Sequence, residues 1–170
     1  MKNEADKIIR FTILYNRYKQ RLYNFLLRLS NNQMTAEDIT QNVFLKFFEK
    51  YDTLQNPESA NYWLFKSARN EYLNYYRKIK REGEITDDLL DQKPDELEME
   101  SFVELKEIKS IVLNELNKME YDQKEVYLLK EYGGLSYKEI ADTLDIEVNL
   151  VKSRLYKVRQ KLINKISKLV

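Results

Sequence analysis

The sequence contains no cysteine and no histidine among its 170 residues. The first absence excludes disulfide bonds and thiol nucleophiles, and the second excludes the commonest general base. Together they rule out zinc sites of the Cys/His kind, so we expect no metal site. Only three glycines occur, and no glycine-rich phosphate loop is among them. An enzyme is therefore the least favoured class, and the composition implies no cofactor.

Long apolar runs are also missing. No stretch approaches the roughly 18 uncharged apolar residues that a membrane-spanning helix needs. The first residues, Met1 to Lys7, lack the apolar centre of a signal peptide. We therefore expect a soluble cytoplasmic protein without membrane insertion.

Charge is distributed unevenly along the chain, although the formal net charge is only +1. Residues 1–81 carry a net charge of +7, residues 82–107 one of −9 and residues 108–170 one of +3. Two basic segments thus flank an acidic one, and basic segments are typical of proteins that bind nucleic acid.

Apolar residues recur at helical spacing through most of the chain, and only two prolines interrupt it. The pattern predicts an all-α fold made of two small helical domains. We expect an N-terminal helical bundle over 1–81, an acidic flexible linker over 82–100 and a C-terminal helix-turn-helix domain over 101–170. The individual helices are predicted at about 5–29, 36–50, 59–81, 102–119, 122–132, 136–144 and 149–170.

Three local signals mark where these helices begin and end. Thr35 is expected to cap the second helix. Ser136 and Glu139 have the spacing of a capping box at the start of the sixth. Gly133 suits the left-handed conformation that often ends a helix.

The last 40 residues combine a short capped helix, a turn and a longer helix with a basic face. This layout is typical of a helix-turn-helix DNA reader, in which the second helix presents its N-terminal half to base edges. The predicted DNA contacts of this domain are Ser136, Tyr137, Asn149, Lys152, Ser153, Arg154, Tyr156, Lys157 and Arg159. Among these, Arg154 and Arg159 are expected to lie closer to phosphates or to protein. The alternative is a solvated basic face on a core helix.

Residues 62–81 place aromatic rings, amides and cations on one predicted helix. Single-stranded nucleic acid is bound in this way, because cations follow the backbone and rings stack on bases. The alternative is that the aromatic residues form core, which we expect for Trp63 and Leu64 and for about half of the tyrosines. Core packing does not explain the cations of residues 77–81, nor Asn70 in the middle of a helix.

The second predicted helix carries a polar stripe opposite its phenylalanines. Asp38, Gln41, Asn42 and Leu45 follow one another at helical spacing, as expected of a surface that binds a protein. Taken alone, a solvated face is the favoured explanation of this stripe.

Together, these motifs resemble those of the extracytoplasmic-function group of bacterial sigma factors. The motifs in the second and third helices are Glu37, Asp38, Gln41 and Phe44, and then Trp63-Leu64, Ala68, Asn70 and Arg77. Those in the C-terminal part are Leu135–Ala141 and Val151–Leu155. The similarity covers roughly residues 10–81 and 108–165.

The resemblance implies that the chain binds core RNA polymerase and promoter DNA and needs no cofactor. Asp38, Gln41, Asn42 and Leu45 would contact the clamp helices of the polymerase, and the C-terminal domain its flap. The loop near 52–61 and the third helix would recognise and melt the minus-ten element. The residues expected to contact this DNA are Lys66, Arg69, Asn70, Asn74, Arg77, Lys78 and Arg81. The helix-turn-helix would read the minus-thirty-five element, and an anti-sigma factor or a recruiting protein would be a further partner.

Two other functions fit the sequence. A stand-alone helix-turn-helix regulator would bind duplex DNA tightly without polymerase, as a dimer on paired half-sites. An interaction module, recruited or sequestered by a partner protein, would have its basic helices covered in a stable complex. The turn of the helix-turn-helix also departs from the resembled family: Asp145, Glu147 and Leu150 stand where relatives often have Gly, Pro and Thr. We expect Glu147 to repel DNA.

Overall fold

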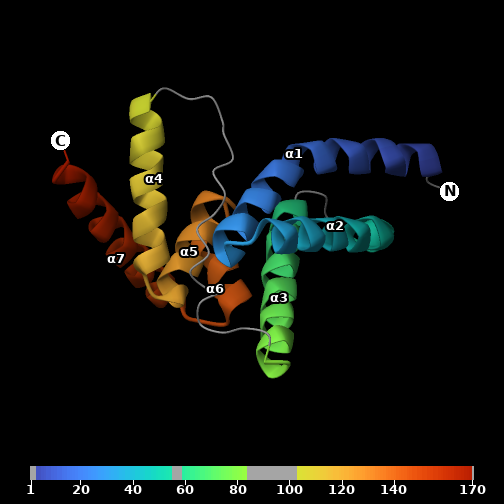
Figure 1. Cartoon of the computed structure of the whole chain (residues 1–170). Helices are drawn as coiled ribbons and strands as arrows, with labels where there is room; N and C mark the ends of the chain where they lie inside the picture. The colour runs from blue at the N-terminus through green and yellow to red at the C-terminus, as the bar shows by residue number, and fades with distance from the viewer. Residues whose placement is uncertain (1–2, 55–58, 84–102, 170) are drawn as a thin grey trace. The chain divides into compact units, whose positions relative to one another are not determined.

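The computed structural model describes residues 3–54, 59–83 and 103–169. These residues form α-helices and one short 3-10 helix, and no strand occurs among them. The elements are α1 (Glu4–Ser30), α2 (Gln33–Lys50), η1 (Tyr51–Thr53), α3 (Ala60–Arg81), α4 (Val103–Lys118), α5 (Tyr121–Glu131), α6 (Tyr137–Leu144) and α7 (Val148–Ser167) (Figure 1). The all-α prediction is confirmed. The linker predicted over 82–100 falls outside the described residues except for its first two.

The helices belong to two compact units, the first with α1, α2 and α3 and the second with α4 to α7. Two small helical units are what the periodicity predicts. No helix in the described ranges is long and apolar enough to cross a membrane.

A turn built from two asparagines joins α1 to α2. Asn31 ends α1 in the left-handed conformation, with φ 52°, and its N–H donates to the Leu27 carbonyl at 2.8 Å. The Asn32 side chain then caps α2 by accepting a hydrogen bond from the Thr35 N–H at 2.9 Å. Asparagine tolerates the left-handed conformation better than most residues, so the corner needs no glycine.

The predicted cap at Thr35 is therefore wrong. Helix α2 begins two residues before Thr35, whose side chain is buried and donates a hydrogen bond to the Tyr75 hydroxyl of α3 at 3.2 Å. Ser, Thr and Asn all cap helices, and the preceding asparagine takes the position here.

The core of the first unit is rich in aromatic rings. Phe47 of α2 lies 5.5 Å from the ring of Trp63 in α3, and Phe25 of α1 lies 5.4 Å from Phe65 of α3. Edge-to-face and tilted contacts of this kind stabilise a core beyond the area that they bury. Leu64 is completely buried as predicted, whereas Trp63 is only partly buried.

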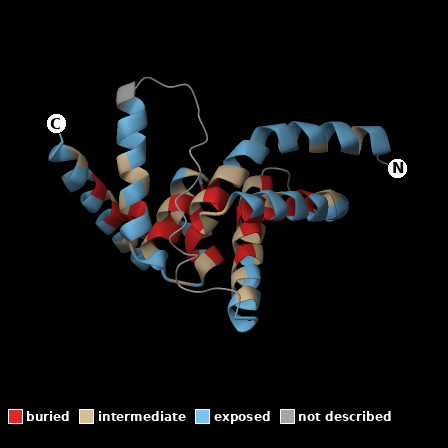
Figure 2. Cartoon of the chain, in the orientation of Figure 1, coloured by how far each residue is buried: buried red, intermediate tan, exposed pale blue. Residues whose placement is uncertain are grey.

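The N-terminal half of α1 packs Phe11 and Tyr15 against Phe44 and Phe47 of this core, but the side of the helix that carries its isoleucines is exposed. Ile8, Ile9 and Ile13 are 49 %, 58 % and 54 % exposed, although apolar residues at helical spacing usually form the buried side of a helix. Figure 2 shows this half of the helix mostly in the colour of exposed residues. Periodicity identifies the helix, but burial also needs a second element on that side, and the described part of the unit places none there.

In the second unit, α4 packs against α7 through Leu116, Val158 and Leu162. The capping box of α6 is confirmed, because the Ser136 Oγ accepts from the Glu139 N–H at 3.1 Å while the Glu139 carboxylate accepts from the Ser136 N–H at 3.0 Å. Asp145 closes α6 in the left-handed conformation with φ 54°.

The glycine prediction is displaced by one residue. Gly134, not Gly133, has a positive φ, of 63°. The N–H of the next residue, Leu135, donates to the carbonyl of Leu129 in α5 at 3.3 Å. Two adjacent glycines leave the choice between them to the surrounding structure, because either can adopt this conformation.

Candidate nucleic-acid and protein interfaces

Helix α2 separates its apolar and polar residues cleanly. Ile39, Val43 and Phe44 are buried against the rest of the unit. The four predicted polymerase contacts all lie on the solvent side and are exposed: Asp38, Gln41, Asn42 and Leu45. Leu45 is 63 % exposed. An exposed leucine among polar side chains gives this face the apolar centre and polar surround of a protein-binding surface.

Met34 extends the same face and was missed in the sequence. Its side chain is 73 % exposed and stands four residues before Asp38, so it belongs to the same helical stripe. The spacing alone could have identified it. We call the five residues Met34, Asp38, Gln41, Asn42 and Leu45 the α2 face.

Helix α3 buries Leu64, Phe65, Ala68 and Tyr72 on one side. The predicted minus-ten residues lie on the other. Five of them are exposed, namely Asn70, Asn74, Arg77, Lys78 and Arg81, while Lys66 and Arg69 are partly buried. The fold thus brings all seven to a single face of one helix, which we call the α3 face.

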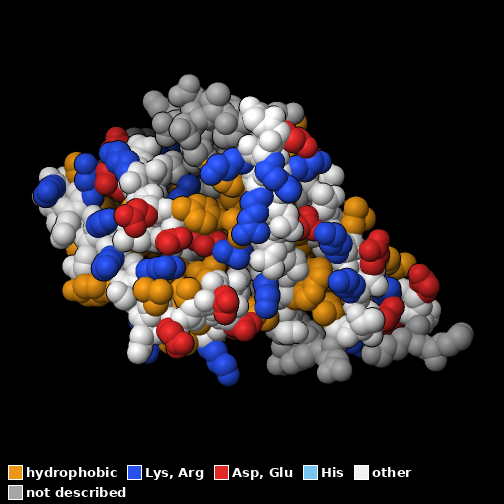
Figure 3. All heavy atoms as spheres, turned by 90° about the horizontal axis from the view of Figure 1, so that it is seen from below, with side chains coloured by type: hydrophobic (Ala, Val, Ile, Leu, Met, Phe, Trp, Pro, Cys, Tyr) orange, Lys and Arg blue, Asp and Glu red, His pale blue; other side chains and the backbone are white. Residues whose placement is uncertain are grey.

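An open hollow lies at the C-terminal end of the α3 face. Asn74, Arg77, Lys80 and Arg81 line it. Figure 3 views the molecule from the side toward which this end of α3 points in Figure 1, and it shows several Lys and Arg side chains together. Three cations and an amide form a surface suited to phosphate. Lys80 is absent from the predicted set, although it stands in the same basic run.

The two partly buried cations are held by neighbours on α3 itself. The Lys66 ammonium donates to the Tyr62 hydroxyl at 3.1 Å and lies 5.2 Å from the centre of that ring. Arg69 donates to the Asn70 side-chain oxygen at 3.4 Å. These contacts orient both cations along the α3 face.

The tyrosines of α3 mainly contact other side chains of the protein. Tyr72 is buried, and its ring lies 6.3 Å from that of Tyr76. Tyr75 is 41 % exposed, but its hydroxyl accepts the hydrogen bond from Thr35. Packing therefore accounts for more of these rings than base stacking does.

Helix α7 turns Val151, Leu155, Val158 and Leu162 inward. Five of the predicted DNA contacts are exposed on its opposite side: Asn149, Lys152, Ser153, Tyr156 and Lys157. Tyr156 is 65 % exposed. We call these five residues the α7 face.

Arg154 and Arg159 contact protein. The Arg154 guanidinium lies 3.4 Å from the Asp122 carboxylate, and that of Arg159 lies 3.5 Å from Glu131. A side-chain hydrogen bond with Tyr137 raises the pKa of Arg159, and Glu131 adds to this effect. Both arginines thus fasten α7 to α5.

Ser136 and Tyr137 stand at the start of α6. The Ser136 oxygen is occupied by the capping box. The Tyr137 ring lies 4.9 Å from the ammonium of Lys130 and 5.9 Å from that of Lys152, which is within the range of cation–π attraction. Lys130, at the end of α5, is a cation of this surface that the sequence did not indicate.

Among the described residues, no group of three or more acidic side chains is placed to hold a metal ion.

Two protein families match the chain. Residues 14–82 match the family described as Sigma-70 region 2, and residues 109–162 match Sigma-70, region 4. The α2 and α3 faces lie in the first match and the α7 face in the second.

Curated relatives cover nearly the whole chain. The chain is 31 % identical to the ECF RNA polymerase sigma factor SigM of Bacillus subtilis, over 88 % of this chain and 90 % of that protein. It is 30 % identical to the RNA polymerase sigma factor YlaC of the same organism, over 88 % and 87 %. It is 29 % identical to the ECF RNA polymerase sigma-E factor of Haemophilus influenzae, over 94 % and 89 %.

Two solved structures share the fold. One is the sigma factor RpoE in complex with the anti-sigma factor NepR from Bartonella quintana, with a TM-score of 0.72 and 24 % identity over 92 % of this chain and 96 % of that one. The other is CnrH in complex with the cytosolic domain of CnrY, with a TM-score of 0.62 and 20 % identity over 97 % and 99 %.

Proposed function

Because the chain belongs to the ECF sigma factors of RNA polymerase, which direct promoter-specific transcription initiation, we propose that its three exposed faces divide the contacts of that process. The α2 face binds core polymerase, the α3 face binds the minus-ten strand and the α7 face binds duplex DNA. One observation carries the assignment: each face lies opposite the buried side of its own helix. The residues of each face are therefore exposed, because the core packs against the other side of the helix.

The α2 face suits a protein partner. Met34 and Leu45 are its most exposed apolar side chains, and the polar residues between them can hydrogen-bond at the edges of an interface. Truncating a few apolar anchors of this kind commonly removes most of the binding energy. We assign the clamp helices of the polymerase to this face.

The α3 face suits a single strand that leaves the duplex. Cations along one side of the helix follow the backbone, and the amides of Asn70 and Asn74 can hydrogen-bond to an unpaired base. The hollow lined by Arg77, Lys80 and Arg81 accepts phosphate at the same end. This distribution supports melting of the minus-ten element.

The α7 face suits the major groove. Asn149, Lys152 and Ser153 are exposed in the N-terminal half of the second helix of a helix-turn-helix, the part that meets base edges. Lys130 and Tyr137 lie beside this face, where the backbone of the duplex would pass. The unit also offers a surface for the polymerase flap.

The proposed role is non-enzymatic, and its place is the cytoplasm, where core polymerase acts. A further proposed partner is an anti-sigma factor or a recruiting protein. Support for it comes from the similar fold of RpoE, which was solved bound to the anti-sigma factor NepR.

The decisive experiment mixes the purified protein with core bacterial RNA polymerase. Co-elution in gel filtration and discrete transcripts from genomic fragments are the expected results. Leu45→Glu should abolish co-elution, whereas Asn16→Glu, a similar change at an exposed position of α1, should not. Specific duplex binding by the protein alone, without any association with polymerase, would instead establish a stand-alone regulator.

A second variant tests the α3 face. Asn70→Ala should keep the association with polymerase but reduce open-complex formation, measured by permanganate reactivity of unpaired thymines. Normal opening by this variant would remove Asn70 from the proposed DNA contacts.

A further inference from the structure

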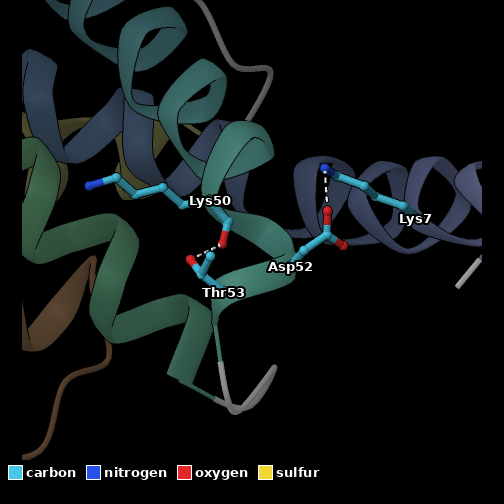
Figure 4. A network of polar contacts seen from close by, with 4 residues as sticks. All are labelled: Lys7, Lys50, Asp52 and Thr53. Carbon is cyan, nitrogen blue, oxygen red and sulfur yellow. Dashed lines mark hydrogen bonds and ion pairs between the residues drawn. The ribbon is translucent and has the colours of Figure 1, made fainter. Parts of the chain in front are cut away.

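An ion pair connects the beginning of α1 to the segment that follows α2. The Lys7 ammonium lies 2.8 Å from the Asp52 carboxylate in η1, 45 residues away in the sequence. Figure 4 shows the Lys7 side chain reaching across to Asp52. The Lys7 side chain is only 17 % exposed, whereas that of Asp52 is 59 % exposed.

Lys7 is held by more than this pair. Its ammonium also lies 4.7 Å from the centre of the Phe48 ring, and Phe48 packs edge-on against Phe11 of α1 at 5.0 Å. A cation over an aromatic face is attracted by the ring as well as by the carboxylate. Lys7 therefore contacts α2 and η1 at once and has little room to move.

Short-range bonds make η1 a defined turn. The Thr53 hydroxyl donates to the Lys50 carbonyl at 2.7 Å, and the Leu54 N–H donates to the Tyr51 carbonyl at 3.3 Å. The Tyr51 ring meets Phe47 edge-on at 5.9 Å. These bonds fix the position of Asp52 relative to Leu54, the last residue of this described segment.

The buried residues of α1 lie in its C-terminal half. Leu22, Phe25 and Leu26, in the C-terminal half of the helix, are completely buried, whereas Ile8, Ile9 and Ile13 are exposed. The N-terminal half contacts other elements in two ways. Lys7 pairs with Asp52 of η1 and lies over the Phe48 ring, and the rings of Phe11 and Tyr15 pack against phenylalanines of α2. This half of the helix thus braces η1 and the end of α2.

We propose that Lys7 is a positioning residue for promoter recognition: by holding Asp52 it fixes η1, the start of the connection that leads to the α3 face. The inference rests on the proposed function of that face. Lys7 also neutralises the Asp52 carboxylate, which would otherwise repel DNA phosphates. The two effects can be separated by substitution.

Lys7→Met removes the ammonium but keeps the aliphatic stem on Phe48. It should lower open-complex formation by the holoenzyme about fivefold, the loss that corresponds to a partly exposed ion pair. Asp52→Asn removes the ion pair without leaving an unpaired carboxylate. Open-complex formation should therefore fall less in this variant than in Lys7→Met. The double variant should behave like Asp52→Asn alone.

The readout specific to positioning is how well the holoenzyme discriminates between its own minus-ten sequence and versions of that sequence with one base changed. It should decline in both single variants and return in the charge-exchanged Lys7→Glu/Asp52→Lys protein. Lys50→Met is the matched control, since Lys50 is exposed and its side chain points away from Asp52 in Figure 4. It should keep wild-type discrimination.

Two further measurements keep the test decisive. Cooperative thermal unfolding and unchanged co-elution with polymerase would show that Lys7→Met folds and binds. Faster hydrogen exchange at the Leu54 amide would show that the turn has loosened. If Lys7→Met kept wild-type promoter discrimination and wild-type hydrogen exchange at the Leu54 amide, the inference would be overturned. Failure of the wild-type protein to bind polymerase or start transcripts would instead overturn the proposed function.

Discussion

Glu71 of α3 accepts a hydrogen bond from the ammonium of Lys46 in α2. The helix that we propose binds polymerase and the helix that we propose binds the promoter strand are thus joined directly by an ion pair. Thr35 and Tyr75 form a second polar connection between the same helices. Two polar contacts thus connect the helix of the α2 face to the helix of the α3 face.

Glu71→Gln should change stability only slightly. The Lys46 side chain is 55 % exposed, so solvent screens the pair, and its loss should lower the free energy of unfolding by less than about 1 kcal/mol. Urea titration followed by circular dichroism measures this quantity. A loss above about 2 kcal/mol would show that the pair holds the two helices together.

Phe47→Ala should destabilise the first unit strongly. The side chain is 1 % exposed and touches the rings of Phe11, Tyr51 and Trp63. Removing it leaves a cavity, and such truncations cost about 3–5 kcal/mol. Leu45→Ala, two residues away and exposed, is the matched control: it should unfold like the wild type but bind polymerase more weakly. Equal stability losses in both variants would contradict the assignment of inner and outer sides of α2.

Lys152→Ala and Arg154→Ala should have different effects. Lys152 is exposed on the α7 face, and if its ammonium also contacts one phosphate, its removal should reduce the slope of log affinity against log salt by about 0.9. The Arg154 side chain is 22 % exposed and paired with Asp122, so its loss should affect stability more than the slope. Binding of promoter duplex at several salt concentrations, alongside thermal unfolding, separates the two. An unchanged slope for Lys152→Ala would remove that residue from the DNA contacts.

Ser136→Ala should lower the stability of the second unit by about 1 kcal/mol, because it removes the hydroxyl that caps α6. Ser153→Ala, at an exposed position of α7, provides the comparison and should stay within about 0.5 kcal/mol of the wild type. Denaturant unfolding of both variants is sufficient. If the two losses were equal, the capping box would not stabilise the unit.

Glu115 should make part of the stability depend on pH. Hydrogen bonding from Lys118 lowers the pKa of this carboxyl below its ordinary value of 4.5, and Lys165 of α7 adds to the effect. A depressed pKa in the folded state gives stability that is present above the unfolded value and is lost as the pH falls through the folded one. The difference in unfolding free energy between the wild type and Glu115→Gln should therefore shrink on acidification below 4.5. A difference that grew instead would contradict the lowered pKa.

Features that depend on neighbouring residues were predicted well from the sequence. The capping box needs only Ser136 and Glu139, three positions apart, and the exposed sides of α2, α3 and α7 follow from helical spacing. The polar residues on those sides were therefore identified before their surroundings were known.

Features that depend on distant residues were not predicted. Thr35 is a good capping residue, but its hydroxyl is used by Tyr75, 40 positions away. Ile9 and Ile13 have the spacing of a buried stripe but no partner helix in the described unit. The pairing of Arg154 with Asp122 likewise depends on how α5 and α7 meet, which spacing within either helix does not indicate.

We expect the acidic turn before α7 to shorten the time that the protein stays on DNA. Asp145 and Glu147 are both exposed there, one closing α6 and the other preceding the first residue of α7. Their charges repel phosphates at the point where the α7 face begins, so we expect a short residence time on duplex. A free sigma factor that leaves DNA quickly remains available in solution, where it competes with other sigma factors for core polymerase.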